Sequence, residues 1–380
     1  SEQAQCQDCY RCVRECPVKA IRVTEGHATV MPERCIACGS CIAACPAGAK
    51  RVRDDLEAVE ALLQGGEPVW VSLAPSYASE FDGLDPRRLV AALRRLGFRG
   101  VSETALGAQE VSARIAQDLD AASGQVLLST ACPVVVDLVE KYLPERAALF
   151  TRVASPLLAH ARLLRARLGT DIRVVFIGPC IGKKAEALAH PAEIDAALTF
   201  ENLRAWLERE ALDPASLEPG EDDRFALGPA AEGARYPIEG GMVDATRLSL
   251  RNGHTRFMAV SGVRQIQRAL RELPEPGDSN LFLELLACEG GCVCGPKALR
   301  HAPVTARMKV LDRVRDAEGA YPRRPSVSVE DAFLPAPQAD APCDAERIEH
   351  VLRRIGKRSP EDELNCGACG YETCRDLARA

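Results

Sequence analysis

The sequence lacks the features by which three common classes of protein are identified. No apolar run approaches the roughly 18 residues that a membrane-spanning helix needs, and no long run of basic residues accompanies the net charge of −6. The N-terminal stretch SEQAQCQDCY contains neither the charged head nor the apolar middle of a signal peptide. We therefore expect a cytoplasmic protein whose partners include neither a membrane nor nucleic acid.

Cysteine, by contrast, is abundant, with 17 cysteines among 380 residues. Cytosolic thiols are kept reduced, so dense cysteine indicates metal binding or catalysis rather than disulfide bonds. The odd count also fits a closed set of disulfides poorly. Because 47% of the residues are hydrophobic, the chain can bury a sizeable core, and its length suits two or three domains.

The first 50 residues contain an internal repeat of cysteines. Cys6, Cys9, Cys12 and Cys16 have the spacing C-x2-C-x2-C-x3-C, and the same spacing returns over residues 35–45, each time followed by proline. Three closely spaced thiolates on one loop can wrap one face of an iron–sulfur cubane. A pair of zinc sites is the alternative, but zinc commonly takes two C-x2-C pairs that lie well apart.

This segment resembles the bacterial two-cluster ferredoxins over residues 1 to about 50. In those proteins the fourth cysteine of each run ligates the other cluster. The resemblance implies two [4Fe–4S] clusters that pass electrons. Their expected ligands are Cys6, Cys9, Cys12 and Cys45 for one cluster and Cys35, Cys38, Cys41 and Cys16 for the other.

The rest of the chain alternates apolar strands with amphipathic helices. A charged helix is expected over residues 51–66, strands over 69–74, 126–128, 174–177 and 281–286, and helices over 86–98, 155–169 and 263–273. This alternation is typical of α/β layers with a largely parallel sheet, in which ligands collect at the carboxyl ends of strands. Cys132, Cys180 and Cys288 each follow such a strand, although buried core cysteines are the alternative.

Three motifs stand around these cysteines: STACP (129–133), GPCIGKKAEA (178–187) and ELLACEGGCVCGP (284–296). In this order they resemble the signature loops of [FeFe] hydrogenases, which read roughly T-S-C-C-P, M-P-C-x-x-K-x-x-E and E-x-M-A-C-x-G-G-C. Four other stretches are more weakly similar to the same family: APSY near residue 75, LGAQEV near 107, DAALTFENL near 198 and IEGGM near 240. The resemblance covers about residues 1–310.

The resemblance implies an H-cluster, which is a [4Fe–4S] cluster joined to a di-iron subcluster with CO, cyanide and an azadithiolate. Maturase proteins make and insert the di-iron subcluster. The implied ligands of the [4Fe–4S] part are Cys132, Cys180, Cys288 and Cys292, and Cys292 is the thiolate that bridges to the di-iron part. Gly178 and Leu286 take the places of two methionines around the di-iron part.

Two polar residues of the second loop also match the family. Lys183 corresponds to the lysine that donates a hydrogen bond to a cyanide, and Glu186 to the family's glutamate. The alternatives are a solvated lysine pair at the start of a helix, which we expect for Lys184, and a surface or helix N-terminal role for Glu186.

The first loop departs from the family's productive members at Ala131. There the family has a cysteine that carries protons toward solvent through nearby carboxylates, and Arg114 and Ile115 stand near the place of the missing acids. Losing a positioned acid–base group costs about 10²–10⁴ in rate, so we expect slow turnover. Cys294 is extra to the pattern and is either a buried bystander or a substitute proton carrier.

A final group of cysteines follows a segment rich in Pro, Ala and acid. Cys366, Cys369 and Cys374 resemble the small iron–sulfur domain of corrinoid proteins and sensory hydrogenases. The fourth cysteine of that domain comes later than Ala380, so we expect a fragment or a chain whose remainder was removed. Cys343 is a candidate replacement ligand, and a three-cysteine zinc site is the alternative.

Together these features predict an α/β hydrogenase domain of two lobes between two iron–sulfur domains. The expected limits are 1–55 for a ferredoxin-like α+β domain, 66–320 for the H-cluster domain, 321–344 for a linker or wrapping arm and 345–380 for the start of a C-terminal [4Fe–4S] domain. The expected function is a sensory [FeFe] hydrogenase that slowly interconverts H2 with protons and electrons. Its expected partners are a redox protein such as ferredoxin, the maturases and a downstream signalling module. The alternatives are a metabolic or electron-bifurcating hydrogenase and an iron–sulfur assembly protein without the di-iron part.

Overall fold

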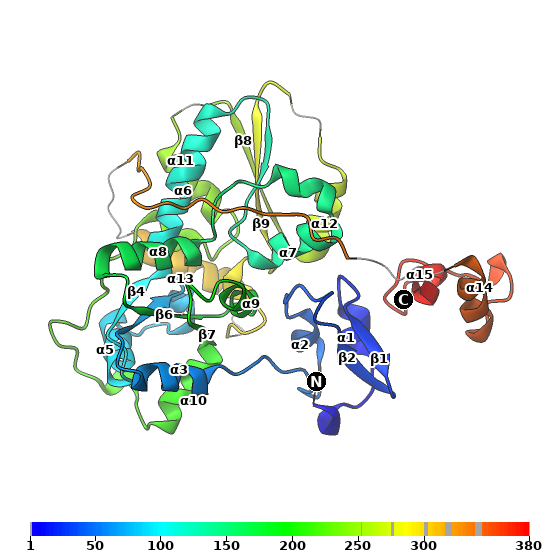
Figure 1. Ribbon diagram of the computed structural model, residues 1–380, viewed down its shortest axis with the longest axis horizontal. Coiled ribbons are helices and arrows are strands. Elements are labelled where there is room, and N and C mark those ends of the chain that lie inside the picture. The colour runs from blue at the N-terminus through cyan, green and yellow to red at the C-terminus, as the bar shows by residue number, and fades with distance from the viewer. Residues whose placement is uncertain are drawn as a thin grey trace.

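The computed structural model describes residues 2–251, 253–274, 277–299, 303–315, 321–338 and 344–379. Two lobes form the main body, a small cysteine-rich domain lies beside them, and the C-terminal helices lie beyond that domain (Figure 1). The mixed α/β architecture predicted from the sequence is confirmed. No helix in these ranges is both long enough and apolar enough to cross a membrane.

The elements have the following bounds. The strands are β1 (Ile21–Thr24), β2 (His27–Val30), β3 (Val69–Leu73), β4 (Gly100–Glu103), β5 (Val126–Leu128), β6 (Arg173–Gly178), β7 (Ala196–Thr199), β8 (Thr255–Ser261) and β9 (Asn280–Leu286). The α-helices are α1 (Arg11–Glu15), α2 (Ser40–Ala44), α3 (Leu56–Gln64), α4 (Tyr77–Glu80), α5 (Pro86–Arg95), α6 (Thr104–Ala121), α7 (Pro133–Tyr142), α8 (Pro156–Leu168), α9 (Gly182–Ala189), α10 (Phe200–Arg209), α11 (Gly241–Ser249), α12 (Val263–Arg271), α13 (Pro303–Arg315), α14 (Ala345–Arg354) and α15 (Cys374–Arg379).

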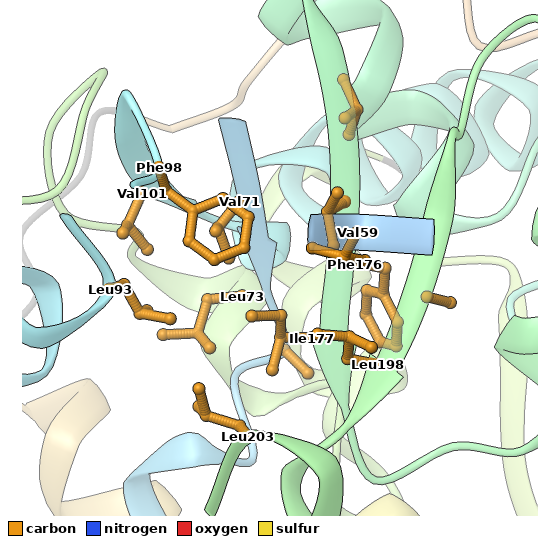
Figure 2. Packing of buried hydrophobic residues seen from close by; sticks show 14 of the residues in the cluster. Val59, Val71, Leu73, Leu93, Phe98, Val101, Phe176, Ile177, Leu198 and Leu203 are labelled. Carbon is orange, nitrogen blue, oxygen red and sulfur yellow. The ribbon is translucent and has the colours of Figure 1, made fainter. Parts of the chain in front are cut away.

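The first lobe is built on a parallel sheet of strand order β4-β3-β6-β7. Its strands are short apolar runs, as expected for strands that are buried on both faces. Val71 and Leu73 of β3 pack with Leu93 of α5 and Leu203 of α10 on one face of the sheet (Figure 2). Because side chains alternate along a strand, Ser72 points to the opposite face, where α8 lies.

The helices of this lobe start at recognisable caps. Asp85 accepts a hydrogen bond from the backbone of Arg87, and Pro86 takes the first helical position of α5. Ser155 and Pro156 open α8 in the same way. These caps fix where each helix leaves the sheet and therefore where its side chains meet the strand ends.

The second lobe contains a parallel sheet of order β5-β9-β8, with β9 in the middle. The four predicted strands are present as β3, β5, β6 and β9, with ends that differ by at most one residue. The sequence prediction missed β4, β7 and β8. The first two, GVSE and AALT, contain few bulky apolar residues, and β8, TRFMAVS, mixes polar with apolar positions and is partly exposed.

The segment 321–338 runs in extended form across the second lobe (Figure 1). Its backbone bonds to the lobe at two places: Ala154 N donates to Val329 O at 2.7 Å, and Ala336 N donates to Glu140 O at 2.9 Å. The segment therefore holds to the main body before the chain reaches α14. The domain limits expected from the sequence stay a prediction.

Candidate metal centre

The three motif loops meet at the carboxyl ends of β5, β6 and β9. Cys132 directly precedes α7, and Cys180 lies between β6 and α9. Cys288 and Cys292 follow β9. Thiols that are far apart in the sequence thus come together where parallel strands of both lobes end, which is where ligands bind in α/β folds.

Electrostatic coupling shows how close these four thiols lie. The pKa of Cys180 is raised to about 11, chiefly by burial and then by the neighbouring Cys132, against the lowering effect of Lys183. Burial also raises the pKa of Cys292, and Cys180 and Cys132 add to this effect. The pKa of Cys288 is raised by burial and then by the other three thiols. Ionised together, they would repel one another in a medium of low dielectric.

This donor set fits an iron–sulfur cluster. Thiolate is the form that binds iron, and cationic metal removes the repulsion that otherwise keeps buried thiols protonated. Four convergent thiols are also the number that a [4Fe–4S] cluster takes. Cys132, Cys180, Cys288 and Cys292 are therefore suited to the group that the sequence predicts, and their assignment as ligands stays a prediction.

A cavity of about 90 Å³ lies beside these thiols, between the two lobes. Its wall is mostly apolar. It is lined by Ala74, Pro75, Ser76, Thr104, Ala105, Ala108, Ala131, Cys132, Pro133, Pro156, Phe176, Pro179, Cys180, Lys183, Tyr236, Pro237, Met242, Leu286 and Cys292. Ala131, Lys183 and Leu286 thus occupy the position that the resemblance implies for the surroundings of the di-iron part.

Gly178 does not belong to the described wall of this cavity, contrary to expectation. A Cβ atom at Gly178 would meet Phe176 Cζ and Ala74 Cβ, so the space next to it is already filled. Phe176 and Met242 line the cavity instead, together with Ser76. The sequence carried a weak signal for two of these residues, because Ser76 lies in APSY and Met242 in IEGGM.

Lys183 and Glu186 form a buried ion pair at the start of α9. Lys183 Nζ lies 2.7 Å from Glu186 Oε2, and both side chains are buried. A surface role for Glu186 is therefore wrong: its carboxylate compensates the charge of the one lysine that reaches the cavity wall. The ion pair compensates both charges in a buried place, where an unpaired charge is costly.

Lys184 is also buried, with 4% of its surface exposed, so the expected solvated lysine is wrong. Its Nζ donates to Asp55 Oδ2 at 2.8 Å and to Ala197 O at 2.6 Å. Burial lowers the pKa of Lys184, and the bond to Asp55 opposes this shift. Lys184 thus connects α9 with Asp55, the residue that precedes α3. The two residues are 129 positions apart, so the local sequence pattern could not predict this contact.

Cys294 does not line the cavity that Ala131 lines. It lines a second cavity, of about 480 Å³, together with Cys288 and Cys38. Burial raises the pKa of Cys294, and Arg307 lowers it. Its position between the two-lobed main body and the cysteine-rich domain does not suit a substitute for the missing thiol at position 131.

The N-terminal cysteines form two groups. The pKa of Cys41 is raised to about 12, first by burial and then by Cys38, Cys35 and Cys16. Burial is the largest cause of the raised pKa of Cys12, and Cys45 raises this pKa as well. The structure thus brings Cys16 to the second run and Cys45 to the first, the crossed arrangement that the resemblance to two-cluster ferredoxins implies.

The remaining two members of the first group are more open. Cys6 is half-buried and Cys9 is exposed. The sixteen cysteines in the described ranges are all free thiols, as expected for metal ligands. Whether each one is a ligand stays a prediction.

The second N-terminal group lies against the candidate H-cluster site. Cys38 raises the pKa of Cys288, and both line the cavity of about 480 Å³. A Cβ atom at Gly39 would clash with the Pro296 side chain, so the two domains are in close contact there. Such closeness is what electron transfer between the two sites requires.

The C-terminal cysteines lie on the other side of the ferredoxin-like domain. Lys19 Nζ lies 4.9 Å from the centroid of the Tyr371 ring. Burial raises the pKa of Tyr371, and Cys16 and Cys369 raise it as well. Cys366 is exposed, whereas Cys369 and Cys374 are half-buried. Cys343, the candidate fourth ligand, lies outside the described residues.

Comparison with known proteins identifies the family. The family model described as iron only hydrogenase large subunit, C-terminal domain, matches residues 67–296, more than half of the chain. The chain belongs to the iron-only hydrogenase family. A 4Fe-4S dicluster domain matches residues 1–46 of this hydrogenase-family chain, and an FeS family model matches residues 362–380.

Two hydrogenases illustrate the relationship. The periplasmic [Fe] hydrogenase large subunit of Nitratidesulfovibrio vulgaris is 24% identical over 358 residues, covering 77% of this chain and 84% of that protein. The NADP-reducing hydrogenase subunit HndD of Solidesulfovibrio fructosivorans is 28% identical over 327 residues, or 70% of this chain. The match covers 55% of HndD, so the chain spans about half the length of that relative.

A solved structure and a protein of another kind are also similar. An [FeFe]-hydrogenase HydA1 variant from Chlamydomonas reinhardtii superposes with a TM-score of 0.53 at 18% identity, covering 69% of this chain and 88% of that one, which shows the shared fold. A probable cytosolic Fe-S cluster assembly factor of Caenorhabditis elegans is 21% identical over 286 residues, covering 62% of this chain and 63% of that protein. Because relatives come from both periplasm and cytosol, the cytoplasmic location stays a prediction.

Proposed function

We propose that this chain is a sensory [FeFe] hydrogenase that binds H2 at an H-cluster and interconverts it slowly with protons and electrons. The observation that carries the proposal is one mostly apolar cavity lined by Cys132, Cys180, Cys292 and Lys183, with the methyl group of Ala131 in its wall and the Cys288 thiol close to these cysteines. Cys132, Cys180, Cys288 and Cys292 would hold the [4Fe–4S] part. The cluster, when bound, supplies the chemistry that polarises H2 and stores electrons.

The chain's own residues supply a dry, shaped and charged surrounding. Phe176, Met242 and Leu286 make the wall of the cavity mostly apolar. Lys183 presents a positive charge there and is held in place by Glu186. A charge-assisted hydrogen bond from this lysine is worth about 1.5–3 kcal/mol in such a place.

Slow turnover is supported by what surrounds Ala131. A methyl group neither accepts nor donates a proton. On α6, Arg114 pairs with Asp118 at 2.9 Å and with Glu330 at 3.1 Å, and Ile115 is fully buried. No carboxylate of this part of α6 is therefore free to act as the outer acid of the family's relay.

The proposed electron path leaves through the ferredoxin-like domain. Cys288 lies beside Cys38, and Cys16 is coupled to Tyr371 near Cys369. Electrons or a conformational signal would pass from the H-cluster through the [4Fe–4S] clusters toward the C-terminal domain, with a ferredoxin-type protein or a signalling module as partner. This order follows from which domain lies between the other two (Figure 1).

An iron–sulfur assembly protein is the second candidate, favoured by the similarity to the assembly factor. A metabolic or bifurcating hydrogenase is the third, favoured by the similarity to HndD. The test is to mature the chain with the di-iron subcluster and to measure H2 oxidation and H2 evolution with artificial redox dyes. Slow activity in both directions supports the sensory hydrogenase. Rates typical of a metabolic enzyme would support the third candidate, and no activity in either direction would support the second.

A further inference from the structure

A second large cavity lies at the edge of the first lobe's sheet and shares no lining residue with the cavity beside the thiols. Its volume is about 860 Å³. Its lining residues come from α5, from β3 and the edge strand β4, from the segment 222–229 and from α13. Ala226 N donates to Val101 O at 2.8 Å, and this bond holds the segment 222–229 along the open edge of β4.

The lining of this cavity is rich in arginine. It contains Arg87, Arg94, Arg99, Arg224 and Arg313. Two of these five are half-buried and already held by acids: Arg94 lies 2.7 Å from Asp223 Oδ1, and Arg313 lies 3.4 Å from Glu103 Oε1. These two pairs fix the wall of the cavity and leave their net charge near zero.

The other three arginines carry charge that no ion pair compensates. In the part of the chain that the structure describes, Arg87, Arg99 and Arg224 are exposed and contact no carboxylate, and Arg87 donates to a backbone carbonyl oxygen. Two aspartates also line the cavity, of which Asp85 caps α5 and Asp222 is exposed. Three unpaired guanidinium groups against two carboxylates leave the cavity positive, so its ligand should be an anion.

The cavity also has an aromatic part. Trp70 and Phe225 line it, and both side chains are half-buried. The indole ring of Trp70 lies over Gly100, its partner in the parallel register, because a Cβ atom at Gly100 would clash with that ring. Arg313 Cζ lies 5.7 Å from the centroid of the Phe225 ring. Aromatic faces beside guanidinium groups suit a ligand that has both a planar base and phosphates.

We propose that this cavity binds a nucleotide, with the base against Trp70 and the phosphates against Arg99 and Arg224. A guanidinium group donates two parallel hydrogen bonds to a phosphate, which makes arginine well suited to such a site. The volume falls in the range of about 300–1,000 Å³ that is typical of small-molecule sites. This inference goes beyond the proposed function and does not depend on it, because the two cavities have separate linings.

The test is equilibrium dialysis of the full chain, carrying its iron–sulfur clusters, against labelled ATP and labelled GTP in the absence of oxygen. We expect at least one of them to bind at one site per chain with a Kd below about 1 mM. Arg99→Gln and Arg224→Gln should each weaken that binding about tenfold, because each removes a charge-assisted donor. Binding of neither nucleotide, or binding that both variants leave unchanged, would overturn the proposal.

Arg95→Gln is the matched control for charge. Arg95 is an exposed arginine of α5 that does not line the cavity, so its substitution removes the same charge from the same side of the lobe. We expect the affinity of Arg95→Gln to stay within about twofold of the wild type at physiological salt, where distant exposed charges are screened. Weakening as large as in Arg99→Gln would mean that net charge alone attracts the nucleotide, and would overturn the site.

Trp70→Leu and Trp70→Phe test the base separately from the phosphates. Leucine removes the aromatic face and phenylalanine keeps one. We expect Trp70→Leu to weaken nucleotide binding about tenfold and Trp70→Phe to weaken it less than about threefold, since stacking accepts any aromatic ring. Pyrophosphate, which has no base, should bind the wild type and Trp70→Leu equally and more weakly than the nucleotide.

Pyrophosphate that binds the wild type as tightly as ATP and GTP would overturn the assignment of a nucleotide, and this comparison needs no variant. A Trp70→Leu variant that is folded, as judged by its thermal unfolding, and keeps full nucleotide affinity would do the same. None of these measurements requires the di-iron subcluster. They therefore decide the nucleotide site whether or not the chain proves to be a hydrogenase, and the activity measurements decide the hydrogenase whether or not a nucleotide binds.

Discussion

Ala131 presents only a methyl group to the cavity that three of the four thiols border. The described wall of this cavity contains no carboxylic acid, and its cysteines are the candidate cluster ligands, so neither kind of group takes the place of the family's proton carrier there. The single residue therefore bears directly on the rate of proton transfer at the candidate centre.

Ala131→Cys is expected to raise turnover. The two side chains differ by one sulfur atom, so the loop before α7 should keep its backbone, and the new thiol would face the cavity. The gain should stay well below the full 10²–10⁴ of a complete relay, because Arg114 and Ile115 stand near the place of the outer acids. Turnover is measured by H2 evolution in the matured protein.

If that variant assembles fully and turns over no faster, proton transfer at position 131 does not limit the rate. The wild type serves as the control for assembly, with equal iron content and equal infrared intensity required before rates are compared.

Lys183→Met is expected to destabilise the H-cluster domain by about 3–5 kcal/mol, because it leaves the buried carboxylate of Glu186 without its partner. The double variant Lys183→Met/Glu186→Gln removes both charges and should recover most of that stability. Both variants lose the cationic donor at the cavity wall, so both should shift the cyanide infrared bands equally. Unfolding curves and infrared spectra measure the two effects separately.

Bands that shift in the single variant and return in the double variant would show that Lys183 acts only through Glu186.

The sequence predicted Lys183 correctly at the cavity but not its partner's role or the burial of Lys184. Both depend on what α9 packs against: Asp55 is 129 residues away from Lys184 in the chain. Motif spacing reports local geometry and leaves such contacts undetermined.

Among the elements, the junction between β9 and α11 shapes the cavity from the side of the second lobe. Glu284 of β9 is buried and accepts hydrogen bonds from Gly240 N at 3.0 Å and from Val243 N at 2.9 Å. It thereby holds the start of α11, which carries Met242 on the cavity wall. Burial raises the pKa of Glu284 to about 7 from an ordinary value of 4.5, against the lowering effect of these two bonds.

This shift predicts a pH dependence of stability. Between the unfolded pKa near 4.5 and the folded pKa of about 7, the folded chain binds more protons than the unfolded chain. The stabilisation is therefore complete below pH 4.5 and is lost as the pH rises through 7, by up to about 3 kcal/mol. Thermal unfolding of the wild type and of Glu284→Gln across this range measures it.

In Glu284→Gln the side chain stays neutral, so this part of the pH dependence should disappear. Equal slopes in the two proteins would mean that Glu284 is ionised in the folded state throughout the range. Iron content is followed in parallel, so that cluster loss is not mistaken for the titration.

The sequence predicted some elements better than others for a physical reason. β3, β5, β6 and β9 are dense apolar runs, and the cysteines that follow three of them marked the site. β4 and β7 contain few bulky apolar residues, and β8 is partly exposed, so their pairing depends on the neighbouring strands rather than on their own pattern. Ser72 and Ser102 illustrate the same limit, because only the register of β3 with β4 brings their hydroxyls together.

At the scale of the whole molecule, the ferredoxin-like domain lies between the hydrogenase lobes and the C-terminal helices (Figure 1). Gly39 and Pro296 mark its contact with the hydrogenase lobes, and Lys19 and Tyr371 its contact with the C-terminal domain. Candidate clusters thus follow one another from the cavity to the C-terminal domain. The order suits transmission of a redox state over the length of the molecule.

Gly39→Ala is expected to weaken the contact with the hydrogenase lobes by about 1–3 kcal/mol, since the added methyl group clashes with Pro296. Gly48→Ala is the matched control: Gly48 also has a positive φ, of +63°, but nothing lies within 4 Å of the Cβ position. We expect slower reduction of the buried cluster by dithionite in Gly39→Ala only, measured by stopped-flow absorbance. Equal slowing in both variants would attribute the effect to backbone strain.

The account as a whole depends on a di-iron subcluster held through Cys292. The most direct measurement is the infrared spectrum of the matured chain beside that of Cys292→Ser. The account predicts CO and cyanide bands in the wild type and their loss in Cys292→Ser, with the iron–sulfur absorbance of the ferredoxin-like domain unchanged. A matured wild type without these bands, or a Cys292→Ser variant that keeps them at full intensity, would contradict it.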